Sequence, residues 1–157
     1  MKIFYLSLFL FIFCLFAVTN VNVAEAQFSA INSDYAVTTN KHGQPVLIGE
    51  KVTAWAGTTN QSVYMVRFTW KNETNHIIFE ENISNFVSYT TPDYPPDAPP
   101  ELIKWAIKGR NEGIPILYFN NTQIPNQLGN WTVQVFFYAP GGQLCGKGSD
   151  IVAIRAT

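Results

Sequence analysis

The chain has 157 residues, of which 47% are hydrophobic and 13% charged, and its formal net charge is −1. Its 10 Lys and Arg residues are matched by 11 Asp and Glu residues, with no run of like charge. Proteins that bind nucleic acid need a basic face to neutralise phosphates, so this composition excludes nucleic acid as a partner and argues against attachment to an anionic membrane surface.

The first 26 residues have the order of a secretory signal peptide. Lys2 precedes Ile3–Val18, an apolar run dominated by Leu and Phe, and the segment closes with Ala24-Glu25-Ala26. A basic start, an apolar core and small residues at −3 and −1 define such a peptide. We therefore expect residues 1–26 to be removed, the mature chain to begin at Gln27, and the protein to be secreted or held at the cell surface.

The alternative is a retained membrane anchor. A spanning helix needs about 20 apolar residues, whereas Ile3–Val18 has 16 and is soon followed by Asn20 and Asn22. The chain also stops at Thr157, shortly after its last expected strand. We expect release or non-covalent attachment to the envelope, without stable membrane insertion after cleavage.

Beyond the leader, period-two alternation between turn residues predicts an all-β protein. We expect a partly flexible segment over residues 27–44 and one domain over residues 45–157. In Trp131–Tyr138, the side chains of Trp131, Val133, Val135 and Phe137 share the expected core face, and Tyr64, Val66, Phe68 and Trp70 do so in Val63–Trp70. The other expected strands are 46–56, 77–81, 86–90, 114–119 and 151–156, with a polar hairpin turn at 71–75. About seven strands is the number in an immunoglobulin-like two-sheet sandwich.

One segment interrupts the strands. Residues 91–100 contain five prolines, which excludes the interior of a strand or a helix. Residues 101–110 then have helical apolar spacing, with Pro99 or Pro100 suited to the first turn and Asp97 near enough to cap it. Basic side chains at 108 and 110 suit the carbonyl end, and Gly109 can terminate the helix. We expect one short inserted helix, with Trp105 covering one end of the core.

N-glycosylation is the strongest chemical signal in the chain. Five Asn-x-Ser/Thr sequons, more than random placement would give, fall at expected loops or strand ends. Their acceptor residues are Asn60, Asn72, Asn82, Asn120 and Asn130.

Ligand contacts are expected at the aromatic residues that flank the proline-rich segment: Tyr89, Tyr94 and Trp105. Aromatic faces suit sugar rings or a protein surface, whereas for Trp105 core packing is the favoured interpretation and ligand contact the alternative. Tyr94, between Asp93 and Pro95, is the best single candidate.

Cys145 is the only cysteine beyond the leader and lies in a glycine-rich stretch, 141–148, which we expect to be an exposed turn. Two interpretations stay open: an intermolecular disulfide that forms a homodimer, or a shielded thiol without a role.

Catalytic and metal-binding motifs are missing from the sequence. His42 and His76 have no His or Cys at ligand spacing, and no hydrolase motif such as G-x-S-x-G or H-E-x-x-H occurs. Glu80 and Glu81 are adjacent on an expected strand, so they face opposite sides and cannot flank one bond. We expect no catalytic residue, no metal and no cofactor; a small secreted enzyme whose site is assembled in space remains an alternative.

Two strands carry a family resemblance. Gly129–Val135 resembles the G-x-W-x-V penultimate strand of immunoglobulin-like and fibronectin type III-like modules in archaeal secreted and cell-surface proteins, and Val63–Trp70 resembles the strand that packs against it. Pro99–Trp105 is similar to an insertion in secreted proteins of ammonia-oxidising archaea. The resemblance implies non-catalytic work at the envelope: adhesion, structure, or binding of a protein or glycan partner.

Overall fold

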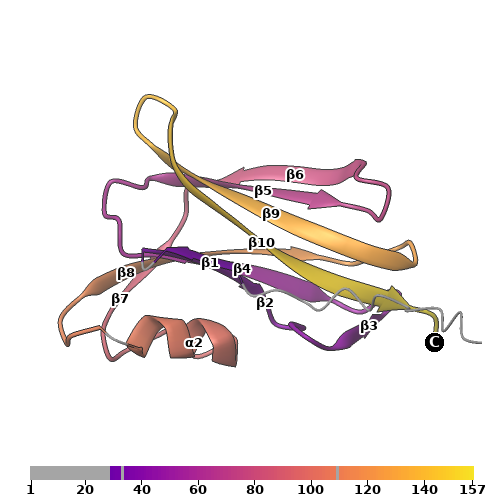
Figure 1. The fold of residues 1–157 in the computed structure, drawn as a ribbon, viewed down its shortest axis with the longest axis horizontal. Helices are drawn as coiled ribbons and strands as arrows, with labels where there is room; N and C mark the ends of the chain where they lie inside the picture. Colours follow the sequence, from indigo (N-terminus) through magenta and orange to yellow (C-terminus); the bar gives the residue numbers. More distant parts are fainter. Residues whose placement is uncertain (1–28, 33, 109) are drawn as a thin grey trace, which may run out of the picture.

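The computed structural model describes residues 29–32, 34–108 and 110–157. The expected signal peptide, residues 1–26, lies outside the described residues, as does Gly109. The described part is an all-β sandwich of two sheets with one short helix against the outside of one sheet (Figure 1). The expected all-β sandwich class is therefore confirmed.

Each sheet contains five strands. The first sheet has the order β1 (Ser29–Asn32), β2 (Tyr35–Thr39), β4 (Val52–Thr58), β8 (Pro115–Gln123), β7 (Val87–Thr90). The second sheet has the order β3 (Pro45–Leu47), β10 (Gln143–Arg155), β9 (Gly129–Ala139), β5 (Met65–Lys71), β6 (Ile77–Ile83). Neighbouring strands are antiparallel except β3, which runs parallel to β10.

The expectation of one strand over residues 46–56 is wrong, because the chain changes sheets within it. Strand β3 belongs to the second sheet and β4 to the first. The turn between them contains Gly49 at φ +85°, a conformation that glycine adopts without steric cost. Glu50 closes the turn, since its N–H donates to the Leu47 carbonyl at 2.9 Å and its carboxylate accepts from the Leu47 N–H at 3.1 Å.

The folded region also extends N-terminal to residue 45, where we expected the domain to begin. Strand β2 pairs along its full length with β4. Its Tyr35 and Val37 side chains are buried between the sheets. This strand was missed because the buried sequence Tyr35–Thr39 is short and its every residue is buried, so it lacks alternation.

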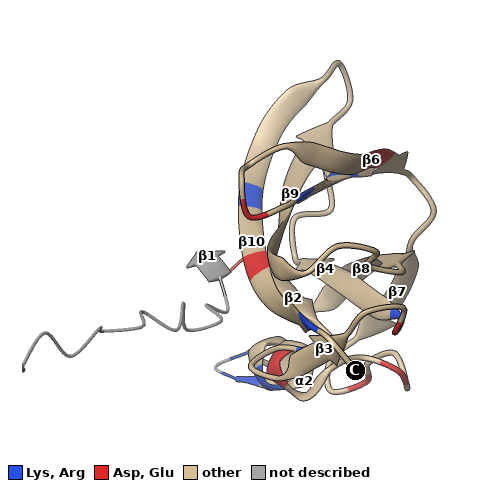
Figure 2. Cartoon of the chain, turned by 90° about the vertical axis from the view of Figure 1, so that its right-hand side faces the viewer, with Lys and Arg blue, Asp and Glu red and all other residues tan. Residues whose placement is uncertain are grey.

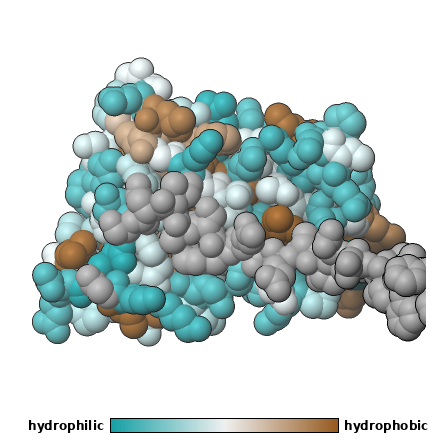
Figure 3. Space-filling model, viewed as in Figure 1, coloured by the Kyte–Doolittle hydropathy of each residue, from teal (hydrophilic) through white to brown (hydrophobic). Residues whose placement is uncertain are grey.

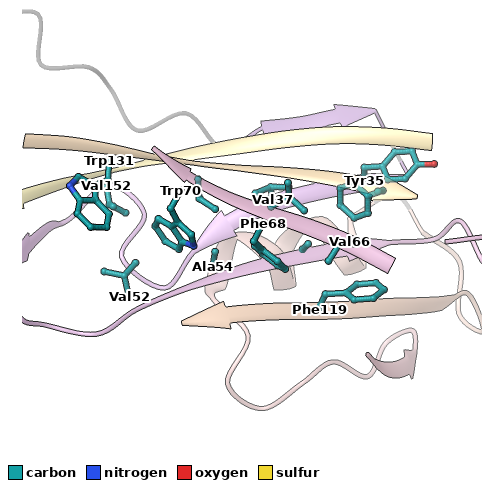
Figure 4. Close-up of a cluster of buried hydrophobic side chains, with 14 of the residues drawn as sticks. Tyr35, Val37, Val52, Ala54, Val66, Phe68, Trp70, Phe119, Trp131 and Val152 are labelled. Atoms are coloured by element: carbon teal, nitrogen blue, oxygen red, sulfur yellow. The ribbon is translucent and has the colours of Figure 1, made fainter. Parts of the chain in front are cut away.

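Large apolar side chains from both sheets fill the space between them (Figure 4). The expected core face of β9 is confirmed, since Trp131, Val133, Val135 and Phe137 are at most 2% exposed. The core face of β5 is confirmed for Val66, Phe68 and Trp70, but Tyr64 precedes the strand and is 43% exposed. Each fully buried large apolar side chain contributes about 1.5–3 kcal/mol, so this layer is the main source of stability.

Two sets of hydrogen bonds connect the two sheets. Trp70 Nε1 on β5 donates to Asn121 Oδ1 on β8 at 2.9 Å, and Asn121 Nδ2 donates to Glu81 Oε2 on β6 at 2.8 Å. At the other edge, the Thr39 N–H on β2 donates to Asp150 Oδ2 on β10 at 2.8 Å. Since buried polar groups cost free energy unless they are hydrogen-bonded, these bonds fix how the two sheets face each other.

The inserted helix, α2, covers Pro100–Ile107 and is shorter than the expected range of 101–110. Proline occupies its first turn as expected, but Pro99 is the N-cap and no side chain caps the helix, so the expected capping by Asp97 is wrong. At the other end, Arg110 Nη1 donates to the Trp105 carbonyl oxygen. That contact confirms the expected role of a basic side chain at the carbonyl end.

Helix α2 packs on the outer face of the first sheet, where it forms a second, smaller core (Figure 1). Its Leu102, Trp105 and Ala106 are buried against this face. Close approach depends on Gly57 of β4, because a Cβ there would lie 2.8 Å from Trp105 Cζ3. Trp105 therefore covers the outside of a sheet, and the expectation that it covers one end of the main core is wrong.

Charged residues of both signs are dispersed over the molecule (Figure 2). The face seen in Figure 3 is mostly hydrophilic, with apolar surface gathered near the hairpin that joins β9 and β10. Leu144, close to this hairpin, is 50% exposed. Within the ranges that the structure describes, no helix is both long and apolar enough to cross a membrane.

Candidate functional site

Thr91 fixes the start of the proline-rich loop, residues 91–99, between β7 and α2. Its backbone N–H donates to the Ile114 carbonyl at 2.9 Å. Its hydroxyl donates to the Asn111 carbonyl at 2.7 Å and accepts from the Ile114 N–H at 3.1 Å. Because this threonine is only 5% exposed, the loop leaves the sandwich from a rigid position beside β8.

A hollow of about 570 Å³ opens between this loop, β7 and the end of α2. We call it the tyrosine hollow. Pockets that bind small molecules have volumes of about 300–1,000 Å³. Tyr94 is 40% exposed and Ile107 is 47% exposed, so the site offers apolar surface beside the polar group of Asp93. Its lining consists of Tyr89, Pro92, Asp93, Tyr94 and Ile107.

The wall behind Tyr89 is a buried tyrosine, Tyr118. The two rings meet edge to face, with centroids 6.1 Å apart and planes at 76°. Burial raises the pKa of Tyr118 to about 12, against the opposing effect of the Arg110 charge. Because this pKa lies well above ordinary pH, the Tyr118 ring is neutral. Its hydroxyl has no hydrogen-bond partner within the part of the chain that the structure describes.

The structure brings Tyr89 and Tyr94 together as expected but keeps Trp105 away from the tyrosine hollow. Trp105 is 7% exposed and its indole packs on the first sheet. The Arg110 guanidinium covers the ring at 4.1 Å from its centroid. Core packing, the favoured interpretation for this residue, is what the structure shows.

The five glycosylation sequons occur on both sheets and on the connections between strands. Asn60 and Asn72 lie in connections, where each side-chain carbonyl accepts a backbone N–H two residues on, at 3.0 Å and 3.1 Å. Asn82 is the penultimate residue of β6, a strand end as expected, but Asn120 lies in the interior of β8, so the expectation that all five occupy loops or strand ends is wrong for Asn120; both side chains are exposed. Asn130 is half-buried at the start of β9.

Cys145 lies in strand β10 and not in the exposed turn that we expected. The register of β10 against β9 shifts between Leu144 and Gly146, which leaves Cys145 at a β-bulge. Its side chain is half-buried and packs against the main core. Sγ lies 3.6 Å from the Gln143 carbonyl.

A buried carboxylate, Asp150 on β10, was not predicted from the sequence. Its side chain is 0% exposed; Oδ1 accepts the Ile151 N–H at 2.8 Å and lies 3.0 Å from His42 Nδ1. Burial raises the pKa of Asp150, and the hydrogen bonds to His42, Ile151 and Thr39 oppose that shift. Asp150 lies two residues before Val152, so the two side chains share one face of the strand, and this spacing could have placed the carboxylate in the core.

The residues that line the tyrosine hollow include one carboxylate, Asp93, and no His, Cys or Ser. In the described ranges, no group of three or more His, Cys, Asp and Glu side chains could hold a metal ion. No protein-family model matches the chain, and no curated protein matches it at a significant level.

Proposed function

We propose that the chain is a secreted, non-catalytic binding module with an immunoglobulin-like fold. In an immunoglobulin domain one sheet contains strands A, B, E and D and the other contains C, F and G, with C′ added in variable-type domains. The run β2-β4-β8-β7 follows the first order, and β10-β9-β5-β6 follows G-F-C-C′. Trp70, fully buried on β5, stands on the strand that carries the buried tryptophan of such domains.

Two features differ from that pattern. The short strand β3 pairs in parallel with β10, and β1 adds a further strand at the edge of the first sheet. Neither β4 nor β9, the strands at the B and F positions, contains a cysteine, so the disulfide that joins B and F in antibody domains has no counterpart. A domain of this length can bury enough apolar surface to fold without one.

The observation that carries the proposal is the tyrosine hollow. Binding residues are commonly held on loops that a rigid scaffold positions, and here Thr91 anchors such a loop to the sandwich. Tyr94 presents about two-fifths of its surface, beside Asp93. Tyrosine combines a large apolar ring with a polar tip, which suits contact with a protein or an envelope component.

A carbohydrate ligand is the second candidate, and the same two residues favour it. A sugar ring has an apolar face that can lie on an aromatic ring and hydroxyl groups that can donate to a carboxylate. Tyr94 and Asp93 are neighbours in sequence and both line the hollow. A glycan array and an array of cell-envelope proteins separate the two ligand classes.

The test compares Tyr94→Ala with Tyr64→Ala. Tyr64 is 43% exposed and does not line the hollow, so it is a matched control for loss of a surface ring. We expect Tyr94→Ala to reduce binding to the ligand identified on these arrays by about tenfold or more, as for a central aromatic contact, while Tyr64→Ala binds like the parent. Equal loss in both variants, or binding that neither variant changes, contradicts a site at the tyrosine hollow.

Export and glycosylation are proposed on the leader and the sequons. Intact mass of the protein isolated from its own host tests both. A mass equal to residues 27–157 plus glycan-sized increments supports the proposal. An unmodified chain that retains residues 1–26 contradicts it.

A further inference from the structure

A second hollow lies on the outer face of the first sheet, beside the proline-rich loop. Its volume is about 330 Å³, near the lower limit of pockets that hold small ligands. All of its lining residues are polar except one tryptophan. They are Asn40, Thr53, Trp55, Asp97, Asn120 and Thr122. We call this site the Asn120 hollow.

Strand register places the tryptophan of this hollow beside a sequon asparagine. Trp55 on β4 is directly opposite Asn120 on β8, and Thr53 is directly opposite Thr122. Directly opposite residues of an antiparallel pair project to the same face with Cβ atoms about 4.5–5.5 Å apart. The two threonine hydroxyl oxygens are 2.8 Å apart. Trp55 is only 5% exposed, so no more than an edge of its indole reaches the sheet surface beside the Asn120 amide.

The middle residue of this sequon is fixed in the core. Asn121 is 5% exposed and is hydrogen-bonded to Trp70 on one side and Glu81 on the other. Because side chains alternate along a strand, an inward Asn121 holds Asn120 and Thr122 outward. Asn120 is exposed, so its amide nitrogen is open to modification while its backbone stays in register.

The polar residues at the rim supply hydrogen-bonding groups. Asp97 contributes a carboxylate from the proline-rich loop. Asn40 is fixed there because its Oδ1 accepts the Thr53 N–H at 2.9 Å and its own N–H donates to the Thr53 carbonyl at 2.9 Å, which leaves its side-chain amide NH₂ to donate. A rim of amide, hydroxyl and carboxylate groups is suited to a pyranose sugar, whose hydroxyls can donate and accept hydrogen bonds.

We propose that the Asn120 hollow seats the first sugar of a glycan attached to Asn120. In this modification Asn120 Nδ2 forms a bond to C1 of a sugar carried on a diphosphate donor. The C1–O bond breaks, the diphosphate leaves with the bonding electron pair, and the amide proton passes to the base of the host transferase. The attached ring then lies beside Trp55, within reach of the Asp97 carboxylate. The inference rests on export, which is part of the proposed function.

The first measurement is glycopeptide mass spectrometry of the full chain produced in a glycosylating host. Asn82 is the comparison, because it is also an exposed sequon asparagine on a strand, near the end of β6, but does not line the hollow. Occupancy at Asn120 is required. An empty Asn120 beside occupied sequons elsewhere overturns the inference and leaves export intact, whereas no occupancy anywhere overturns the export on which it rests.

The second measurement tests whether the attached sugar contacts the loop. Asp97→Ala and Asn120→Gln are combined in a double-mutant cycle, with protein from the glycosylating host and from a host without glycosylation. We expect coupling of about threefold to tenfold in the folding equilibrium constant, the effect of one hydrogen bond, only in glycosylated protein. Both variants change exposed side chains, so they are expected to fold. Occupancy without coupling overturns the seating.

A free sugar is the other source of the same chemistry. Unmodified protein is titrated with N-acetylglucosamine and with glucose while the indole N–H signal of Trp55 is followed by NMR. We expect no saturable shift at millimolar sugar, because the free ring lacks the covalent link that holds it in place. A saturable shift that Asp97→Ala abolishes would assign the hollow to a sugar from solution and overturn attachment as its purpose.

Discussion

Replacing Gly57 with alanine tests how closely helix α2 must approach the first sheet. A Cβ at this position would lie 2.8 Å from Trp105 Cζ3 and 3.2 Å from Leu102 Cδ1, whereas ordinary van der Waals contact begins at 3.4 Å. Leu102 is 0% exposed and Trp105 is 7% exposed, so neither side chain can swing into solvent. The added methyl group must displace the helix or force a strained rotamer.

Two opposing effects determine the size of the change. Overpacking a well-packed core typically costs about 1–3 kcal/mol, and alanine in a strand gains about 0.5–1 kcal/mol over glycine. The φ of Gly57 is not in the left-handed region, so alanine adds no backbone strain. We expect a net loss of roughly 0.5–2 kcal/mol in the free energy of unfolding.

Urea unfolding of four proteins measures this loss: the parent, Gly57→Ala, Trp105→Phe and the double variant. Phenylalanine lacks the far part of the indole, so it makes room for the new methyl group. We expect the double variant to be more stable than the sum of the single losses predicts, with an unchanged m-value. A Gly57→Ala protein at least as stable as the parent, or strict additivity, would refute the steric explanation.

Three further predictions concern buried polar groups and the thiol. Burial raises the pKa of Asp150, so its contribution to stability is full below the unfolded pKa near 3.8 and is lost as pH rises through the raised pKa. The unfolding free energy of the parent minus that of Asp150→Asn should therefore fall with pH. A difference that is constant or rises would contradict this. Trp70→Phe removes the donor to Asn121 and should cost about 1–3 kcal/mol in urea unfolding, more than Trp70→Phe costs when Asn121 is already leucine. Cys145 packs against the core, so we expect slow maleimide labelling and a monomer on non-reducing gels, and a reductant-sensitive band at twice the mass would show the intermolecular disulfide instead.

Local pattern was sufficient where one strand has one buried and one exposed face. Strand β9 alternates regularly between buried and half-buried residues, and its core face was predicted. The pattern fails where the chain changes partners: the apolar residues on both sides of Gly49 in 46–56 do not reveal that the turn there sends the two halves into different sheets. Local preference is a property of neighbours in sequence, but sheet membership depends on distant strands.

The candidate sites divide in the same way. Tyr94 lies in the proline-rich loop and Tyr89 just before it, so proximity in sequence was enough to predict that they share a surface. The pairing of Trp55 with Asn120 depends on the register of β4 against β8. Trp105 was expected over one end of the main core because helical spacing alone does not show that Gly57, far away in sequence, admits its ring against the outer face of the sheet.

The two hollows share the proline-rich loop, and this gives them a common physical consequence. Tyr94 and Asp97 are three residues apart in that loop, one lining the tyrosine hollow and the other the Asn120 hollow. A sugar held against Asp97 would restrict the loop before any ligand arrives, and a loop ordered in advance loses less entropy on binding.

If both proposals hold, Asn120→Gln should weaken ligand binding at Tyr94 by a few-fold in glycosylated protein, although Asn120 does not line that site. Isothermal titration of the ligand identified on the arrays measures this effect, and the same variant made without glycosylation should bind like its unglycosylated parent. A loss of equal size in both hosts would mean that the substitution itself disturbs the loop, and the link through the sugar would be wrong.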